Sequence, residues 1–216
     1  MKQTVASVVH LYERYEKIAD GTVHVAGIVF AINASLWLLW KVTGLSALIS
    51  VSIYCLGLMA MIGCSAAYNL MPQSRPSKAI LRRLDHAAIF IMIAATYTPL
   101  AMNRLAPPWG PLILAAIWSL ATFGVTMKIM APRKFEMASI ALYLCMGWLV
   151  VTVIEPLAHS LAHIDFWLLI AGGVVYSAGV IFYLLDRLPF NRAIWHGFVL
   201  AAVVLHFSCI YGEFAH

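Results

Sequence analysis

The sequence predicts an all-α integral membrane protein, a seven-transmembrane-helix bundle with its N-terminus in the cytoplasm and its C-terminus outside. First, 63% of its 216 residues are hydrophobic and only 11% are charged. A soluble domain is typically about 45–50% apolar and about 25% charged. Second, the apolar residues form seven stretches near the roughly 20 residues that cross about 30 Å of hydrocarbon. Third, the lysines and arginines lie mostly in alternate loops, which indicates an orientation.

The seven predicted spans follow one another closely. They cover residues 23–44, 46–71, 85–104, 109–131, 136–158, 164–185 and 193–214. Continuous apolar runs such as Ile89–Ala95 favour helices, because barrel strands alternate apolar and polar residues. We therefore expect one transmembrane domain, residues 23–214, and any function must lie in the bundle or its short loops.

Residues 1–22 are predicted to form a separate cytoplasmic segment. Val5, Val8, Val9, Tyr12 and Tyr15 can form the apolar face of a helix lying on the membrane, and a partly ordered tail is the alternative. The segment has no short apolar core followed by small residues, so we do not expect a cleavable signal peptide.

The positive charges indicate which side each loop occupies. Twelve of the 14 lysines and arginines lie in the N-terminal segment or in the loops after spans 2, 4 and 6, whereas Lys41 and Arg104 lie on the other side. Positively charged loops stay in the cytoplasm. We expect a multi-pass protein of the cell inner membrane whose basic loops contact anionic lipid headgroups, so nucleic acid is not needed to explain them. The sequence does not identify protein partners, which are left open.

Polar residues enter four spans near their cytoplasmic ends, where ionisable groups are costly and often functional. They are His24, Ser65, Asn69, Asp85, Arg192 and His196. The pairs Ser65/Asn69 and Arg192/His196 are spaced by four, so each pair shares a helix face. Ordinary roles remain open, because Asp85 can cap the third span and Arg192 can extend to headgroups.

A second polar group lies near the opposite face. Glu155, His159, His163 and Asp165 have side chains that can bind a metal. Pro156 and the position in a loop favour an ordinary polar helix end.

The chain resembles bacterial haemolysin III proteins, a branch of the progestin and adipoQ receptor (adiponectin receptor-like) superfamily. The resemblance covers about residues 16–207. The segments that carry it are Glu16–Asp20 with His24, Ser65–Asn69, Leu84–His86, Ala94–Pro99, Met146–Trp148, Gly172–Tyr176 and Ala193–Val199. It implies seven helices and a cytoplasmic N-terminus.

The resemblance also implies a zinc site near the cytoplasmic face. In eukaryotic members the ligands are a His in a Ser-x-x-x-His motif on helix 2 and two His in a His-x-x-x-His motif on helix 7. The Ser and an Asp on helix 3 lie nearby, and the Asp holds the zinc-bound water. Carried over, Ser65 and Asp85 match the possible catalytic positions and His196 matches one ligand. Asn69 and Arg192 occupy the other two ligand positions.

These two residues put the zinc site in doubt. An amide oxygen is a weak zinc ligand, and a guanidinium stays protonated and repels a dication. We therefore expect zinc to be absent or weakly bound, with only His196 and Asp85 remaining from a metal site. Our hypothesis is that Arg192 replaces the metal by pairing with Asp85. The alternative is a rearranged metal site in which His24 or His86 joins His196 and Asp85.

Three functions follow from these observations. The favoured one is a sensor or regulator of membrane or lipid state with a degenerate zinc site. The first alternative is a ceramidase-like hydrolase of lipid amides, in which metal-activated water attacks the carbonyl. The second is a pore-forming cytolysin. Whether the protein is an enzyme is left open.

Overall fold

The computed structural model describes residues 2–72, 74–131, 134–185 and 187–215, with side chains described from residue 14 onward. The helices are α1 (Lys2–Lys41), α2 (Leu45–Leu70), α3 (Lys78–Asn103), α4 (Trp109–Met130), α5 (Glu136–Gly147), the 3₁₀ helix η1 (Trp148–Val153), α6 (Ile154–Ser160), α7 (His163–Leu184) and α8 (Asn191–Phe214). Within the described chain, 7 helical segments are long and apolar enough to cross a membrane, and α5, η1 and α6 together make the fifth. The predicted seven-helix fold is confirmed.

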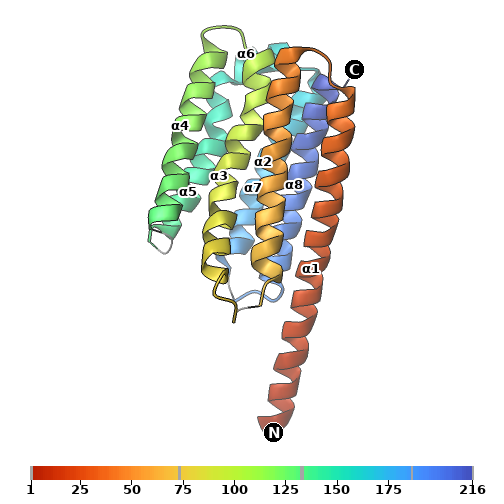
Figure 1. Ribbon diagram of the computed structural model, residues 1–216, viewed down its shortest axis with the longest axis vertical. Coiled ribbons are helices and arrows are strands. Elements are labelled where there is room, and N and C mark those ends of the chain that lie inside the picture. The colour runs from red at the N-terminus through yellow and green to blue at the C-terminus, as the bar shows by residue number, and fades with distance from the viewer. Residues whose placement is uncertain (1, 73, 132–133, 186, 216) are drawn as a thin grey trace.

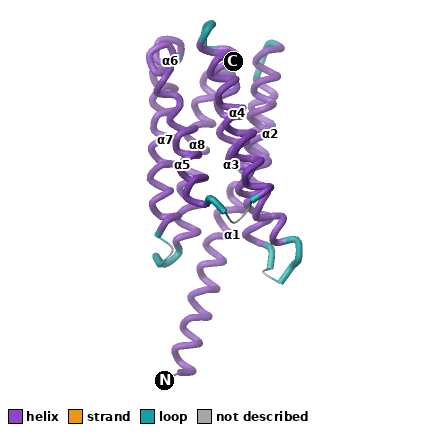
Figure 2. Tube along the Cα trace, turned by 90° about the vertical axis from the view of Figure 1, so that its left-hand side faces the viewer, coloured by secondary structure: helices purple, strands orange, loops and turns teal. Residues whose placement is uncertain are grey.

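The helices stand side by side and their loops lie at the two ends of the bundle (Figures 1 and 2). The most extensive packing joins α2 to α3, α3 to α4 and α7 to α8, and α8 also packs against α1, which closes the bundle. We call the end where α2, α4 and α7 finish and α3, α5 and α8 begin the basic end. The chain enters at this end and leaves at the other (Figure 1). That the basic end faces the cytoplasm stays a prediction.

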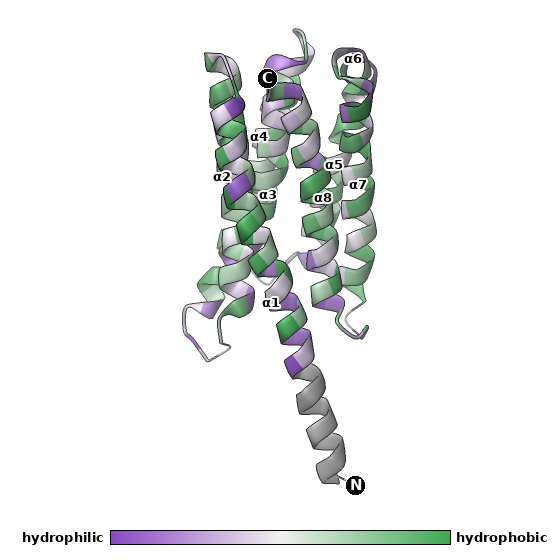
Figure 3. Cartoon of the chain, turned by 90° about the vertical axis from the view of Figure 1, so that its right-hand side faces the viewer, coloured by the Kyte–Doolittle hydropathy of each residue, from purple (hydrophilic) through white to green (hydrophobic). Residues whose placement is uncertain are grey.

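The helices of the bundle consist of hydrophobic residues along most of their length, as Figure 3 shows. Large side chains such as Leu36, Leu56 and Phe123 are 63–70% exposed, which suits contact with lipid chains. Small residues permit close helix packing where no hydrophobic effect drives helices together. A Cβ on Gly57 would lie 2.5 Å from the Cβ of Ala95, so only glycine allows this approach of α2 to α3.

The third span starts earlier than the sequence indicates, because α3 begins at Lys78 and not near residue 85. Lys78 Nζ donates hydrogen bonds to the carbonyl oxygens of Tyr68 and Met71, which anchors the start of α3 on the end of α2. Carbonyls at a helix C-terminus lack helical partners, and a lysine can satisfy them. Asp85 therefore lies inside α3, so its alternative role as an N-cap is excluded.

The fifth span is not one continuous helix. Tyr97 Oη on α3 lies 2.9 Å from the carbonyl oxygen of Met146 and 2.8 Å from that of Gly147, and it accepts a hydrogen bond from the Val150 amide. A side chain that enters the helical hydrogen-bond ladder breaks it. The span therefore passes from α5 through η1 to α6.

The first helix is longer than predicted, since α1 runs without interruption from Lys2 to Lys41, and its segment Arg14–Lys41 is long and apolar enough to cross a membrane. The predicted apolar face of Val5, Val8, Val9 and Tyr12 lies outside the residues whose side chains are described.

At the end away from the basic end, Glu213 joins three elements. Its Oε2 lies 2.5 Å from Arg104 Nε after α3, and its Oε1 accepts a hydrogen bond from the Ala162 amide before α7. This end is therefore held by polar contacts.

Candidate functional site

The bundle encloses a cavity of about 510 Å³. At the basic end its lining includes all six of the predicted residues, which are His24, Ser65, Asn69, Asp85, Arg192 and His196. Further from this end the wall is mostly apolar, with Met92, Leu100, Ile113, Val153 and Leu157. Four helices thus bring these polar groups to one mouth of the cavity, which Arg82, His86, Lys128 and Glu136 also line.

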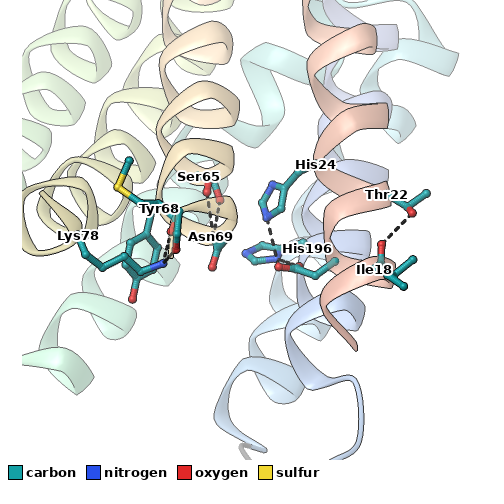
Figure 4. A network of polar contacts seen from close by, with 10 residues as sticks. Ile18, Thr22, His24, Ser65, Tyr68, Asn69, Lys78 and His196 are labelled. Atoms are coloured by element: carbon teal, nitrogen blue, oxygen red, sulfur yellow. Dashed lines mark hydrogen bonds and ion pairs between the residues drawn. The ribbon is translucent and has the colours of Figure 1, made fainter. Parts of the chain in front are cut away.

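On α2 the predicted helix face is present. The Asn69 side-chain amide donates hydrogen bonds to the Ser65 carbonyl oxygen at 3.0 Å and to Ser65 Oγ at 3.3 Å (Figure 4). The amide nitrogen of Asn69 is thereby directed to its own helix. Asp85 lines the same cavity from α3.

The expected ion pair between Arg192 and Asp85 is not formed. Both residues are described, and neither makes an ion pair with any described residue. Arg192 is the second residue of α8 and is exposed. Asp85 lies seven residues after the start of α3 at Lys78, about 10 Å further along the helix axis. Arg192 therefore lies at the exposed start of its helix, whereas Asp85 lies about two turns inside its own helix.

A three-residue cluster joins α1 to α8, and sequence reasoning missed one of its members. His196 Nδ1 lies 2.5 Å from Asp20 Oδ1, and His24 Nε2 lies 3.6 Å from Asp20 Oδ2 (Figure 4). The two imidazole rings have centroids 4.5 Å apart. Asp20 and His24 are spaced by four on α1, which could have identified the pair, but residue 20 was assigned to the N-terminal segment.

A second ionic group occupies the basic ends of α3, α4 and α5. Glu136 Oε1 lies 2.6 Å from Arg82 Nη2, and Glu136 Oε2 lies 3.2 Å from Lys128 Nζ and 3.8 Å from His86 Nδ1. The Lys128 side chain is only 1% exposed. Because His86 belongs to this group, it does not join His196 as the alternative metal site required.

The zinc positions implied by the resemblance do not fit the ion in this structure. The nitrogen of the Asn69 amide faces Ser65, and Arg192 is a permanent cation. A zinc site needs three protein ligands beside a water. His196 is the one imidazole left at these positions, and it is hydrogen-bonded to Asp20.

Comparisons with known proteins cover nearly the whole chain. The family model described as "Haemolysin-III related" matches residues 13–207. The chain is 37% identical over 198 residues to "Hemolysin-3" of Bacillus cereus, an alignment that spans 90% of each chain. It is 34% identical over 198 residues to the "Hemolysin-3 homolog" of Bacillus subtilis (strain 168), spanning 90% of this chain and 92% of the relative.

More distant relatives are eukaryotic. The chain is 28% identical over 205 residues to the human "Monocyte to macrophage differentiation factor", spanning 91% of this chain and 84% of the relative. It is 26% identical over 180 residues to the "Heptahelical transmembrane protein ADIPOR2" of Oryza sativa subsp. japonica, spanning 73% of this chain and 79% of the relative. No solved structure matches the chain.

Proposed function

This chain belongs to the haemolysin III-related family of multi-pass cell-membrane proteins, and we propose that it is a non-catalytic sensor or regulator of lipid state that binds one membrane lipid in its interior. The observation that carries this proposal is the cavity of about 510 Å³, apolar along its depth and polar at the basic end. Ligand sites typically have volumes of about 300–1,000 Å³, apolar walls and a few polar groups.

The polar mouth is suited to an anionic headgroup. Arg192 lines the cavity, is exposed, and makes no ion pair with any described residue. A guanidinium binds phosphate oxygens through paired hydrogen bonds. The side-chain amide of Asn191 belongs to a residue that lines the same mouth. A phospholipid with its phosphate near Arg192 and an acyl chain in the apolar part fits both regions.

Access from the bilayer is available between the fifth span and α7. Trp148 and Tyr183 line the cavity and are 38% and 37% exposed, so the lining extends to the lipid-facing surface. α5 and α7 make few contacts, and this part of the fifth span is joined to α7 by a hydrogen bond from Trp148 Nε1 to Ser177 Oγ at 3.0 Å. A lipid chain can therefore enter sideways with modest local movement.

The proposed role is non-catalytic because two of the three zinc positions that the resemblance implies, 69 and 192, hold Asn and Arg, so no metal-activated water is expected between them. Neither side chain activates water as a metal does. Asp85 and Ser65 remain at the cavity wall, where they are available for hydrogen bonds to a lipid headgroup.

The test compares two glycine substitutions. Gly173 lines the cavity and Gly63 does not, and an added Cβ meets nothing within 4 Å at either position. Gly173→Leu therefore fills part of the cavity, whereas Gly63→Leu is the matched control. Native mass spectrometry of the purified proteins counts the phospholipid retained by each chain after detergent is removed.

We expect the parent and Gly63→Leu to retain phospholipid and Gly173→Leu to lose it. Equal retention by all three proteins would refute binding in the cavity. Release of fatty acid from a fluorescent ceramide by the purified parent would replace the sensor role with hydrolysis. Leakage of dye from liposomes that contain the protein would favour a pore instead.

A further inference from the structure

We propose that Asp20, His24 and His196 form a binding site for one divalent transition-metal ion between α1 and α8, apart from the zinc positions that the resemblance implies. Within the described chain, these three residues form a group that could hold a metal ion, with all their ligand atoms within 4.8 Å of one another. Only His196 is shared with the zinc positions implied by the resemblance, which are 69, 192 and 196.

The spacing of the ligand atoms suits a metal. Bonds of about 2.0–2.1 Å in a tetrahedral zinc site place two ligand atoms about 3.3 Å apart. His24 Nε2 and Asp20 Oδ2 are separated by 3.6 Å. His196 Nδ1 is 2.5 Å from Asp20 Oδ1, which is a hydrogen bond that a metal would replace by a small rotation of the carboxylate.

The second observation is a buried nitrogen without a hydrogen bond. His24 is 4% exposed, and its Nε2 has no hydrogen-bond partner. Leaving a buried polar atom unpaired costs about 1–3 kcal/mol. This nitrogen is directed toward the carboxylate of Asp20, so a metal ion in the cluster would bond to the one ligand atom that is otherwise unsatisfied.

The ligand set selects the kind of ion. Two imidazoles suit zinc and other first-row transition metals, whereas magnesium and calcium prefer oxygen ligands. Three protein ligands leave at least one coordination position for water or a small ligand. His24 and His196 line the cavity, so that open position is accessible from it.

A metal at this place would join the first and last spans. Asp20 and His24 lie on α1 and His196 lies on α8, helices that are distant in sequence and adjacent in the bundle. An ion that binds only the folded state stabilises it. Bound metal should therefore hold α1 against α8 at the basic end.

The test uses the full chain without an affinity tag, purified in detergent and stripped of metal with EDTA. The protein is equilibrated with zinc or with magnesium, and bound metal is counted by mass spectrometry. We expect about one zinc per chain, little magnesium, and a zinc-dependent rise in melting temperature on the order of 5 °C.

Three ligand variants and one control locate the ion. Asp20→Asn, His24→Gln and His196→Gln should each weaken zinc binding at least about 100-fold, since changing even a group behind the ligands costs about 10–100-fold. His163→Gln removes an exposed histidine at the other end of the bundle and should leave zinc binding unchanged.

X-ray absorption of the zinc-loaded parent protein keeps the proposal testable if a variant fails to fold. Two imidazoles and one carboxylate around the zinc are expected. Absence of zinc from the parent at saturating concentration would overturn the proposal. The proposal would also be overturned if Asp20→Asn and His24→Gln still bound zinc while His196→Gln did not. That result would indicate that zinc binds at the positions implied by the resemblance, of which His196 is one.

Discussion

Replacing Glu136 by glutamine should destabilise the bundle through the lysine that it leaves behind. Lys128 Nζ lies 3.2 Å from Glu136 Oε2, and the Lys128 side chain is 1% exposed. Glu136 also contacts Arg82 at 2.6 Å, so one carboxylate serves two cations. When Glu136→Gln removes the carboxylate charge, the buried ammonium of Lys128 has no anionic partner in the described network.

The expected loss of unfolding free energy follows from the exposure of Glu136 and Lys128. Removing one partner of a buried ion pair typically costs about 3–5 kcal/mol, because the other charge stays buried without compensation. Glu136 is 34% exposed, so solvent screens part of the interaction and we expect a loss of about 2–3 kcal/mol. Lys128→Met should cost less than about 1 kcal/mol, since Glu136 keeps Arg82 as its partner.

The assay is reversible unfolding in mixed micelles with increasing SDS. It is applied to Glu136→Gln, Lys128→Met, the double variant, and Glu155→Gln as an exposed acidic control. The double variant should be about as stable as Lys128→Met alone, which gives a coupling free energy of about 2 kcal/mol. A loss below about 0.5 kcal/mol for Glu136→Gln would refute the reasoning and mean that water reaches Lys128.

Two further predictions concern the fifth span and the polar mouth. Tyr97→Phe should cost about 1–3 kcal/mol in the same unfolding assay, because it leaves a backbone amide and two carbonyls of the fifth span without their hydroxyl partner; no loss would show that water takes its place. In a His24→Gln chain that has lost zinc, adding Asn69→His and Arg192→His should restore about one bound zinc, since both positions line the cavity with His196. Failure to restore it, in a variant that elutes as the parent does, would show that positions 69 and 192 lie too far from His196.

Much of the candidate site could be predicted from the sequence. The six polar residues were placed near one end of four helices, and all six line one cavity. The spacing of Ser65 and Asn69 correctly indicated a shared face, and their hydrogen bond confirms it. These relations are local, or they follow from the alternating direction of successive membrane spans. The roles proposed for these residues remain to be tested by the experiments above.

The partners across helices were less predictable. Arg192 was expected to meet Asp85, and Asp20 was not expected to contribute. The sequence indicated that Asp85 begins the third span, but α3 begins at Lys78, which binds the end of α2, so Asp85 lies inside the helix. The contact of Asp20 with His196 depends on α1 continuing below residue 23 as a helix beside α8.

By itself the sequence determined the number of spans, the apolar exterior and the polar layer at one end. The bilayer imposes these features directly, because each crossing needs about 20 apolar residues and polar groups are costly within it. Only the tertiary structure decided the break at η1, the position of Arg192 and the Asp20–His24–His196 cluster. The break at η1 and the contact of Asp20 with His196 each depend on a side chain of one helix meeting another helix, and no local pattern of residues encodes such a meeting.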